Sequence, residues 1–241
     1  MSMNVLEASG LGKRYRTTWA LRECTLAVPA GHVAALAGPN GAGKTTLLNL
    51  AVGLAAPSAG GVTVLGDQLP GSPGALDGIA FVAQDTPLYK TLSAADLLHL
   101  TRNLTRRFDQ AYAEARLGEL GIPLRRKAGK LSGAQLALTL ALARRPRLLV
   151  LDEPVAMLDP IARHDFMATV LAAVSADGVS VLLSSHVLTE LERVASYLVL
   201  LSRGQVRLAG AVDDLLATHH QASLEELALT YLREAPAEVA K

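Results

Sequence analysis

The sequence predicts an α/β protein with a mostly parallel core sheet, an N-terminal antiparallel β subdomain and an inserted α-helical subdomain. Short apolar strands alternate with helical segments, which is typical of a parallel sheet covered on both faces. The alternation stops from about residue 87 to 145, where apolar residues recur at helical spacing instead. We therefore expect a helical subdomain inserted at about 87–145 of a larger domain that spans 1–210.

The elements before the insertion begin with two amphipathic strands, in NVLEASGL and RECTLAV. A mostly apolar strand, His32–Ala37, then leads into GPNGAGKTT and a helix in LLNLAVGL, and GVTVLG and GIAFVAQ are further strands. Within the insertion, two helices follow the polar residues Ser93 and Asp109, which are typical N-caps.

After the insertion, strands in RLLVLDEP and VSVLLSSH alternate with helices in PIARHDFMATVLAAVSA and VLTELERVA. A hairpin is expected around Arg203-Gly204, because two apolar runs flank a glycine there. From Asp213 the chain reads as helical, with a capping box formed by Ser223 and Glu226. We expect residues 211–241 to form a helical C-terminal tail.

Composition excludes several classes of protein. The net charge is +1, so nucleic acid is not an expected partner. A single cysteine, Cys24, cannot form an internal disulfide and favours a reducing compartment. No apolar run reaches the roughly 18–20 residues of a membrane span, and the first residues lack the apolar region of a signal peptide. We expect a cytoplasmic chain that reaches a membrane only through partners.

A phosphate-binding loop is predicted at GPNGAGKT, residues 38–45, because the motif lies between a strand and a helix. Glycines let the backbone N–H groups surround phosphate oxygens at a helix N-terminus. Lys44 supplies a cation to the outer phosphates, Thr45 a Mg²⁺ ligand and Thr46 a further hydrogen bond. The loop residues expected to contact nucleotide are Gly38, Pro39, Asn40, Gly41, Ala42, Gly43, Lys44, Thr45 and Thr46.

Two acids follow a buried strand, at the edge where α/β sheets bind ligands. Asp152 ends the strand and is expected near Mg²⁺. Glu153 is placed to orient or deprotonate a water that attacks the γ-phosphate. Together with the phosphate loop, these acids predict nucleotide hydrolysis.

The order of the remaining motifs resembles that of the ATP-binding-cassette (ABC) ATPases over at least residues 4–210. The matching positions, in chain order, are Tyr15, Gln84, the turn LSGAQ (131–135), Asp159 and His186. The resemblance implies ATP and Mg²⁺ as cofactors, with Thr45, Gln84 and Asp152 as metal ligands. It also implies that Glu153, His186 and Gln84 are catalytic.

The same resemblance assigns the other motifs. Tyr15 would stack on adenine, and Trp19 is a rival for that role. Ser132, Gly133 and Gln135 would act in trans on the ATP of a second cassette, in a head-to-tail dimer whose interface includes Asp159. The usual signature has a second glycine and then a basic residue, where this chain has Ala134 and Leu136. The Cβ at 134 is harmless if that backbone is helical but crowds the phosphate if φ is positive, and Leu136 removes a possible charge partner. The two departures together predict weaker sandwiching and slower hydrolysis than Gly and Arg would give.

The expected partners are a second nucleotide-binding subunit, identical or different, and separate integral membrane subunits. The segments around the phosphate loop and AQDTPLYKTLSAADLL, with the short helical tail, resemble the bacterial exporter branch for drugs and lipids. The chain would then be attached to the cytoplasmic face of the membrane. The alternative is a soluble ABC ATPase that acts in translation or DNA maintenance, and the cargo is left open.

Overall fold

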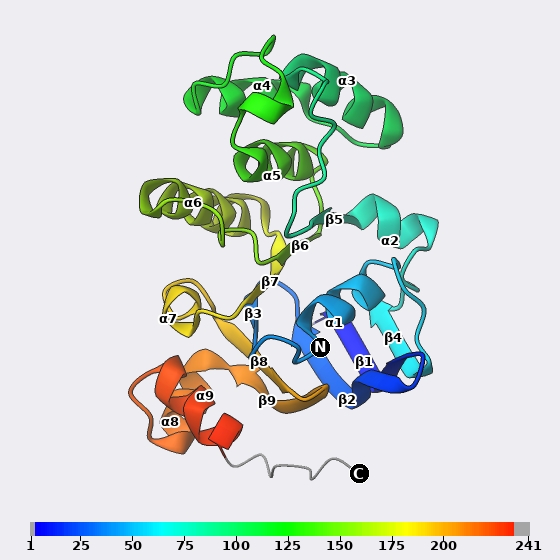
Figure 1. Ribbon diagram of the computed structural model, residues 1–241, viewed down its shortest axis with the longest axis vertical. Coiled ribbons are helices and arrows are strands. Elements are labelled where there is room, and N and C mark those ends of the chain that lie inside the picture. The colour runs from blue at the N-terminus through cyan, green and yellow to red at the C-terminus, as the bar shows by residue number, and fades with distance from the viewer. Residues whose placement is uncertain (1–2, 234–241) are drawn as a thin grey trace.

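The computed structural model describes residues 3–233, and its strands form two sheets (Figure 1). The smaller sheet is antiparallel, with the order β2-β1-β4. Its strands are β1 (Asn4–Tyr15), β2 (Thr18–Pro29) and β4 (Ala59–Val64). This sheet is the predicted N-terminal antiparallel β subdomain.

The larger sheet has the order β5-β6-β7-β3-β8-β9, and all neighbouring strands are parallel except β8 and β9. Its strands are β3 (Val33–Ala37), β5 (Ile79–Val82), β6 (Leu148–Asp152), β7 (Ser180–Ser185), β8 (Tyr197–Ser202) and β9 (Gln205–Ala211). Every residue of β3, β6 and β7 is buried. This burial explains their continuous apolar sequences, because helices or the second sheet cover both faces.

Two groups of helices lie toward opposite ends of the molecule. Helices α3, α4 and α5 lie together at one end of the molecule, and α8 and α9 lie near the other end (Figure 1). The bounds are α1 (Lys44–Ala51), α2 (Pro73–Gly78), α3 (Ala94–Leu104), α4 (Gln110–Glu119), α5 (Gly133–Ala143), α6 (Pro160–Asp177), α7 (Leu188–Leu191), α8 (Val212–His219) and α9 (Leu224–Arg233). The fold class predicted from the sequence is confirmed.

Apolar side chains fill both faces of the larger sheet. Leu36 and Val150 face a core shared with the smaller sheet and α1. Ala35 and Leu149, their neighbours in sequence, face the core shared with α5, α6 and α9. Successive side chains of a strand point to opposite faces, so one buried strand serves two cores. A third core lies among α3, α4 and α5.

Some local predictions are confirmed and others are wrong. Ser93 and Asp109 cap α3 and α4 as expected. The helix predicted in VLTELERVA is only one turn, α7, and the tail is broken at His220, whose φ is 52°. The predicted capping box of α9 is half formed: Ser223 accepts from the Glu226 N–H, but the Glu226 carboxylate binds the Ala222 N–H.

Candidate functional site

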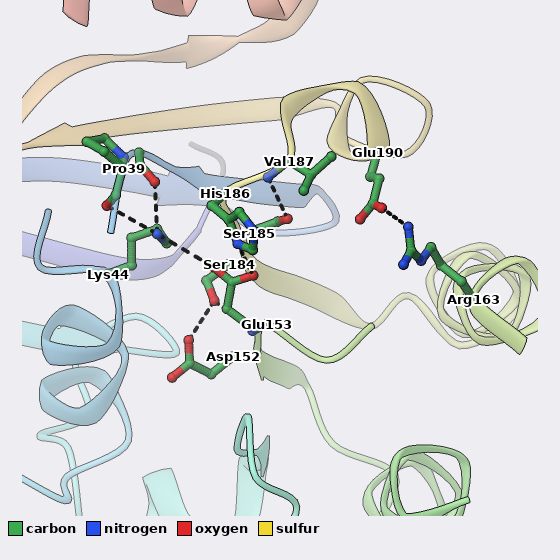
Figure 2. A network of polar contacts seen from close by, with 11 residues as sticks. Pro39, Lys44, Asp152, Glu153, Arg163, Ser184, Ser185, His186, Val187 and Glu190 are labelled. Atoms are coloured by element: carbon green, nitrogen blue, oxygen red, sulfur yellow. Dashed lines mark hydrogen bonds and ion pairs between the residues drawn. The ribbon is translucent and has the colours of Figure 1, made fainter. Parts of the chain in front are cut away.

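The glycine-rich loop connects β3 to α1, and Lys44 is the first residue of that helix. Gly43 precedes it with φ 103°, where a Cβ would lie 2.7 Å from the Ala20 carbonyl oxygen, so only glycine fits. The Lys44 ammonium donates to the carbonyls of Gly38 at 2.8 Å and Pro39 at 3.4 Å. The loop therefore curls around a buried lysine nitrogen (Figure 2).

The acids lie at the carboxyl end of β6, next to the end of β7. Asp152 is only 2% exposed, and the Ser184 hydroxyl donates to its Oδ1 at 2.6 Å. Ser184 Oγ also accepts the backbone N–H of Glu153 at 2.9 Å. Within residues 3–233, no cation is paired with the Asp152 carboxylate. A buried carboxylate held by one hydroxyl is well suited to bind a metal ion.

Glu153 joins three elements at this edge of the sheet. Its Oε1 lies 3.6 Å from the Lys44 ammonium, and its Oε2 lies 2.9 Å from Nδ1 of His186, which follows β7 (Figure 2). Its own backbone has φ 45°, an uncommon conformation for a residue with a Cβ. The backbone turn after β6 thus directs the carboxylate between a cation and an imidazole.

A pocket of about 410 Å³ opens above these groups, and its volume is in the range of small-molecule sites. Its lining residues are Tyr15, Ala20, Asn40, Gly41, Gly43, Lys44, Thr45, Thr46, Gln84, Glu153 and His186. Of the predicted loop residues, Gly38, Pro39 and Ala42 do not line it, and neither does the predicted metal ligand Asp152. Tyr15 lines the pocket and Trp19 does not. Each ring has a cation over it, Lys13 at 5.1 Å from the Tyr15 centroid and Arg14 at 5.6 Å from that of Trp19. The geometry therefore favours Tyr15 over its rival.

The signature turn lies apart from this pocket, and none of Ser132, Gly133 and Gln135 lines it. Ser132 is the N-cap of α5, but its hydroxyl makes no capping hydrogen bond. That hydroxyl is buried without a partner among the described residues. Gly133 opens the helix, with room for a Cβ at 3.5 Å from Thr86 Oγ1. The same chain therefore does not bring its turn and its phosphate loop together.

The two departures from the usual signature have different surroundings. Ala134 lies in the first turn of α5 and has no positive φ, so its Cβ is compatible with the backbone. Leu136 is fully buried in the core among α3, α4 and α5. A basic residue at 136 would have to be buried, so restoring one would not simply improve the site as the sequence suggested.

Asp159 lies at an exposed turn in front of α6. Its carboxylate caps the helix and accepts the N–H groups of Ile161 and Ala162, both at 3.0 Å. Met157 and Ile161, on either side of it, are 92% and 77% exposed. Large apolar side chains so exposed beside a rigid cap suit a contact with another protein.

Sequence reasoning missed two features of this site. Ser184 holds both acids in place, and its only signal was a serine pair inside the apolar run VSVLLSSH. The ion pair between Arg163 and Glu190 joins α6 to α7, and no local pattern could have indicated it.

The donor set fits a Mg²⁺ ion that is shared with phosphate. No group of three or more His, Cys, Asp or Glu side chains in the described part of the chain could hold a metal alone. The Thr45 hydroxyl, the Gln84 amide and the buried Asp152 carboxylate are oxygen donors of the type that Mg²⁺ prefers. Mg²⁺ commonly binds proteins through one or two such groups together with substrate phosphates.

Comparison with known proteins decides the family. The family model for ABC transporters matches residues 21–156 of this chain, which include the phosphate loop, the signature turn and both acids.

The chain belongs to the ABC transporter family, as an ATP-binding subunit.

Its relatives agree with this assignment. An ABC transporter ATP-binding protein of Nostoc sp. is 31% identical over 235 residues, covering 90% of this chain and 69% of the relative. A thiamine import ATP-binding protein, ThiQ of Mesorhizobium japonicum, is 33% identical over 200 residues, covering 80% of this chain and 79% of that protein. The solved structure of an ATP-binding subunit of an ABC transporter superposes with a TM-score of 0.82 at 29% identity, covering 94% and 99% of the two chains.

This ABC ATPase has no helix in residues 3–233 that is long and apolar enough to cross a membrane.

Proposed function

We propose that this subunit binds and hydrolyses ATP in a dimer of cassettes and powers transport through separate membrane subunits. The observation that carries the proposal is the network of Lys44, Glu153 and His186 at the carboxyl edge of the parallel sheet. It places a phosphate-binding cation, a carboxylate base and an imidazole around one pocket. These are the groups that phosphoryl transfer to water requires.

The proposed nucleotide contacts follow from the lining of the pocket. Tyr15 would stack on the adenine, and the loop N–H groups with Lys44 would bind the β- and γ-phosphates. Thr45, Gln84 and Asp152 would hold Mg²⁺, which supplies positive charge to the phosphate oxygens when bound. Lys44 is held by loop carbonyls and Glu153 in this structure, so binding of phosphate has to draw it away from them.

Glu153 is the proposed general base, and His186 holds its carboxylate in place through Nδ1. When Lys44 turns toward phosphate, its ammonium leaves the Glu153 carboxylate, and Glu153 Oε1 is then available to accept a proton from water. The 2.9 Å contact with His186 is independent of Lys44, so the carboxylate remains oriented. The site thus keeps its base in position while nucleotide enters.

The signature turn is proposed to complete the site of a second cassette. The first N–H groups of an α-helix lack partners within the helix, and Ser132 does not cap those of α5. They can therefore bind an anion such as a γ-phosphate. The Ser132 hydroxyl is turned inward and would rotate about χ1 to another staggered position to join them.

An apolar groove of about 570 Å³ is the proposed docking surface for the membrane partner. Leu76, Tyr89 and Leu104 line it and are among the most exposed large apolar residues of the described chain. Phe81, Pro87 and Leu88 also line it, on either side of Gln84 in sequence, so the groove and the nucleotide pocket share one segment. We propose that an apolar helical segment of the membrane subunit occupies this groove, at the cytoplasmic face of the membrane.

The direction of transport is proposed as export. The support is the resemblance to the exporter branch, together with a described tail that consists of the short helices α8 and α9. The relatives do not choose between directions, because they include a thiamine import protein. In inside-out vesicles with the membrane partner, an exporter would accumulate a fluorescent lipid or dye when ATP is added outside. A role in translation or DNA maintenance is not favoured, since the relatives named above are transporter proteins.

The central test uses two substitutions in the pocket. Glu153→Gln should lower turnover about 100-fold or more while nucleotide affinity is kept, because a general base contributes that much. Lys44→Ala should lose tight binding of a fluorescent ATP analogue. Steady-state ATPase and fluorescence titrations measure the two effects. Full activity of Glu153→Gln would remove this residue as the base, and normal affinity of Lys44→Ala would contradict the phosphate role.

A further inference from the structure

Arg163, in the first turn of α6, binds two segments that flank the candidate site without lining its pocket. Its Nη1 donates to Glu190 Oε1 in α7 (Figure 2). Its Nη2 donates to the Leu158 carbonyl at 3.3 Å. The Arg163 side chain is 35% exposed and that of Glu190 is 24% exposed. The forked guanidinium allows one side chain to hold both acceptors at once.

The two segments are functionally distinct. Leu158 immediately precedes Asp159, which caps α6 at the exposed turn beside Met157 and Ile161. Glu190 lies four residues after His186, the imidazole that contacts Glu153. Arg163 therefore connects the turn expected to face a second cassette with the segment that carries the histidine.

Helix α7 depends on such external contacts for its position. It has four residues and no side-chain N-cap, and a single helical turn has little stability of its own. Leu191 anchors it to the core below, and Glu192 accepts the Leu224 N–H of α9 at 3.2 Å. These two contacts lie at the end of α7 far from His186. Nearer to His186, Leu188 packs against the same core, and the Val187 N–H donates to Ser185 Oγ at 3.0 Å. On the side that faces α6, the ion pair between Glu190 and Arg163 holds α7 in place.

We infer that Arg163 is a positioning residue for ATP hydrolysis, which fixes the His186 segment relative to the Asp159 turn through Glu190 and Leu158. This inference rests on the proposed function, because it assumes that His186 orients Glu153 and that the Asp159 turn contacts a second cassette. A partner seated on that turn presses on Leu158, and Arg163 carries the displacement to α7. Docking of the second cassette thereby fixes the position of His186 relative to Glu153.

Loss of this link should affect the chemical step rather than nucleotide binding. Without Arg163, α7 is still held by Leu191 and Glu192, so the chain is expected to fold. His186 would sample more orientations, and fewer of them would orient Glu153. The expected result for Arg163→Gln is a fall in kcat of about tenfold with unchanged KM for ATP.

The experiment compares Arg163→Gln, Glu190→Gln, the double variant and the charge exchange Arg163→Glu with Glu190→Arg. Each single variant should lose about tenfold in kcat, because each breaks the same connection from Leu158 through Arg163 to Glu190. The double variant should lose no more than either single variant, because that connection is already broken. The exchange should recover part of the loss, because it restores the ion pair but not the bond to Leu158. Affinity for a fluorescent ATP analogue and the melting temperature should stay close to those of the wild type.

Arg107→Gln is the matched control, because Arg107 also forms an ion pair, with Asp77, on the surface away from the pocket. It should leave kcat unchanged. Normal kcat in both Arg163→Gln and Glu190→Gln, additive losses in the double variant, or an equal loss in Arg107→Gln would overturn the inference. If Arg163→Gln does not fold, Glu190→Gln and Arg163→Lys decide the question, and the lysine variant should keep intermediate activity.

Failure of this inference can be distinguished from failure of the proposed function. A wild-type chain without ATPase activity, or an active His186→Ala variant, would count against the proposed function itself. An active wild-type chain with inactive His186→Ala and unaffected Arg163→Gln would overturn only the role of Arg163.

Discussion

The helices α3, α4 and α5 each begin at a polar residue, but only two of them use it as a cap. The Ser93 hydroxyl accepts the Asp96 N–H at the start of α3, and the Asp96 carboxylate accepts the Ser93 N–H in return. Asp109 accepts the Tyr112 N–H at the start of α4. Ser132 makes no such bond, although it occupies the same position in front of α5.

The difference distinguishes helices whose first N–H groups are capped by a side chain from a helix whose first N–H groups are uncapped and can bind a ligand. Capping side chains satisfy N–H groups that would otherwise lack partners, and this stabilises α3 and α4. The start of α5 forgoes that stabilisation and keeps its N–H groups available. The rest of α5 is anchored by apolar residues such as Leu136 and Leu140, so the helix does not need the cap.

The strongest way to test the open start is to mix two inactive variants. Lys44→Ala damages a chain's own phosphate loop, and Ser132→Ala damages only the turn that it offers to a partner. Ser132→Ala alone should lose at least about tenfold in turnover, because a hydrogen bond to a charged group contributes about 1.5–3 kcal/mol. Lys44→Ala alone should lose turnover because it no longer binds ATP tightly. On mixing, activity should return, because a dimer of one of each contains one intact composite site.

ATPase activity measured against the mixing ratio provides the readout, with Ser93→Ala replacing Ser132→Ala as the control partner. No recovery at any ratio would contradict action in trans.

A second test asks whether the helix behind the open start is as closely packed as the burial of Leu136 indicates. Leu136→Arg places a charge in the core among α3, α4 and α5, and should lower the free energy of unfolding by about 3 kcal/mol. Ala134→Gly should lower it by only about 1 kcal/mol, since residue 134 is helical. Urea unfolding measures both. Faster ATP hydrolysis and unchanged stability in Leu136→Arg would show that the position tolerates the basic residue of the usual signature.

A third test sets the two serines against each other. Ser93→Ala should cost about 1 kcal/mol of stability by removing a cap, and should leave kcat unchanged. Ser132→Ala should lower kcat and leave the melting temperature unchanged, because its hydroxyl makes no hydrogen bond in this structure. Calorimetry and ATPase assays on both variants measure the contrast. Equal loss of stability in Ser93→Ala and Ser132→Ala would contradict the distinction between the capped start of α3 and the uncapped start of α5.

The smallest effect concerns pH. The N–H of Tyr112, and after it the Arg145 guanidinium, lower the pKa of Asp109 below its ordinary value of 3.8. The folded state thus favours the carboxylate, so its contribution to stability is present above pH 3.8 and is lost as the pH falls through the lowered pKa. Asp109→Asn should lower the melting temperature slightly at pH 7 and less near pH 3. A constant difference at all pH values would contradict the charged cap.

Local sequence was enough to predict which segments line the candidate pocket. Gly43, Lys44 and Thr45 lie within one turn between a strand and a helix, so their spacing determines their geometry. Asp152 and Glu153 were predictable for a related reason: they end an apolar strand, and parallel strands present their carboxyl ends at one edge. The caps Ser93 and Asp109 depend only on the next three residues, and both predictions were correct.

Only the tertiary structure decided how distant residues meet. Ser184 reaches Asp152 because β6 and β7 are neighbours in the sheet. Arg163 reaches Glu190 because the fold brings the start of α6 within reach of α7. Packing also turned the Ser132 hydroxyl inward, buried Leu136 and placed Tyr15 rather than Trp19 at the pocket. The sequence by itself determined the class of reaction, because the phosphate loop and the acids at the end of β6 take their conformation from residues adjacent in the chain. The contacts that orient the chemistry depend on packing between residues far apart in the chain, which no local pattern records.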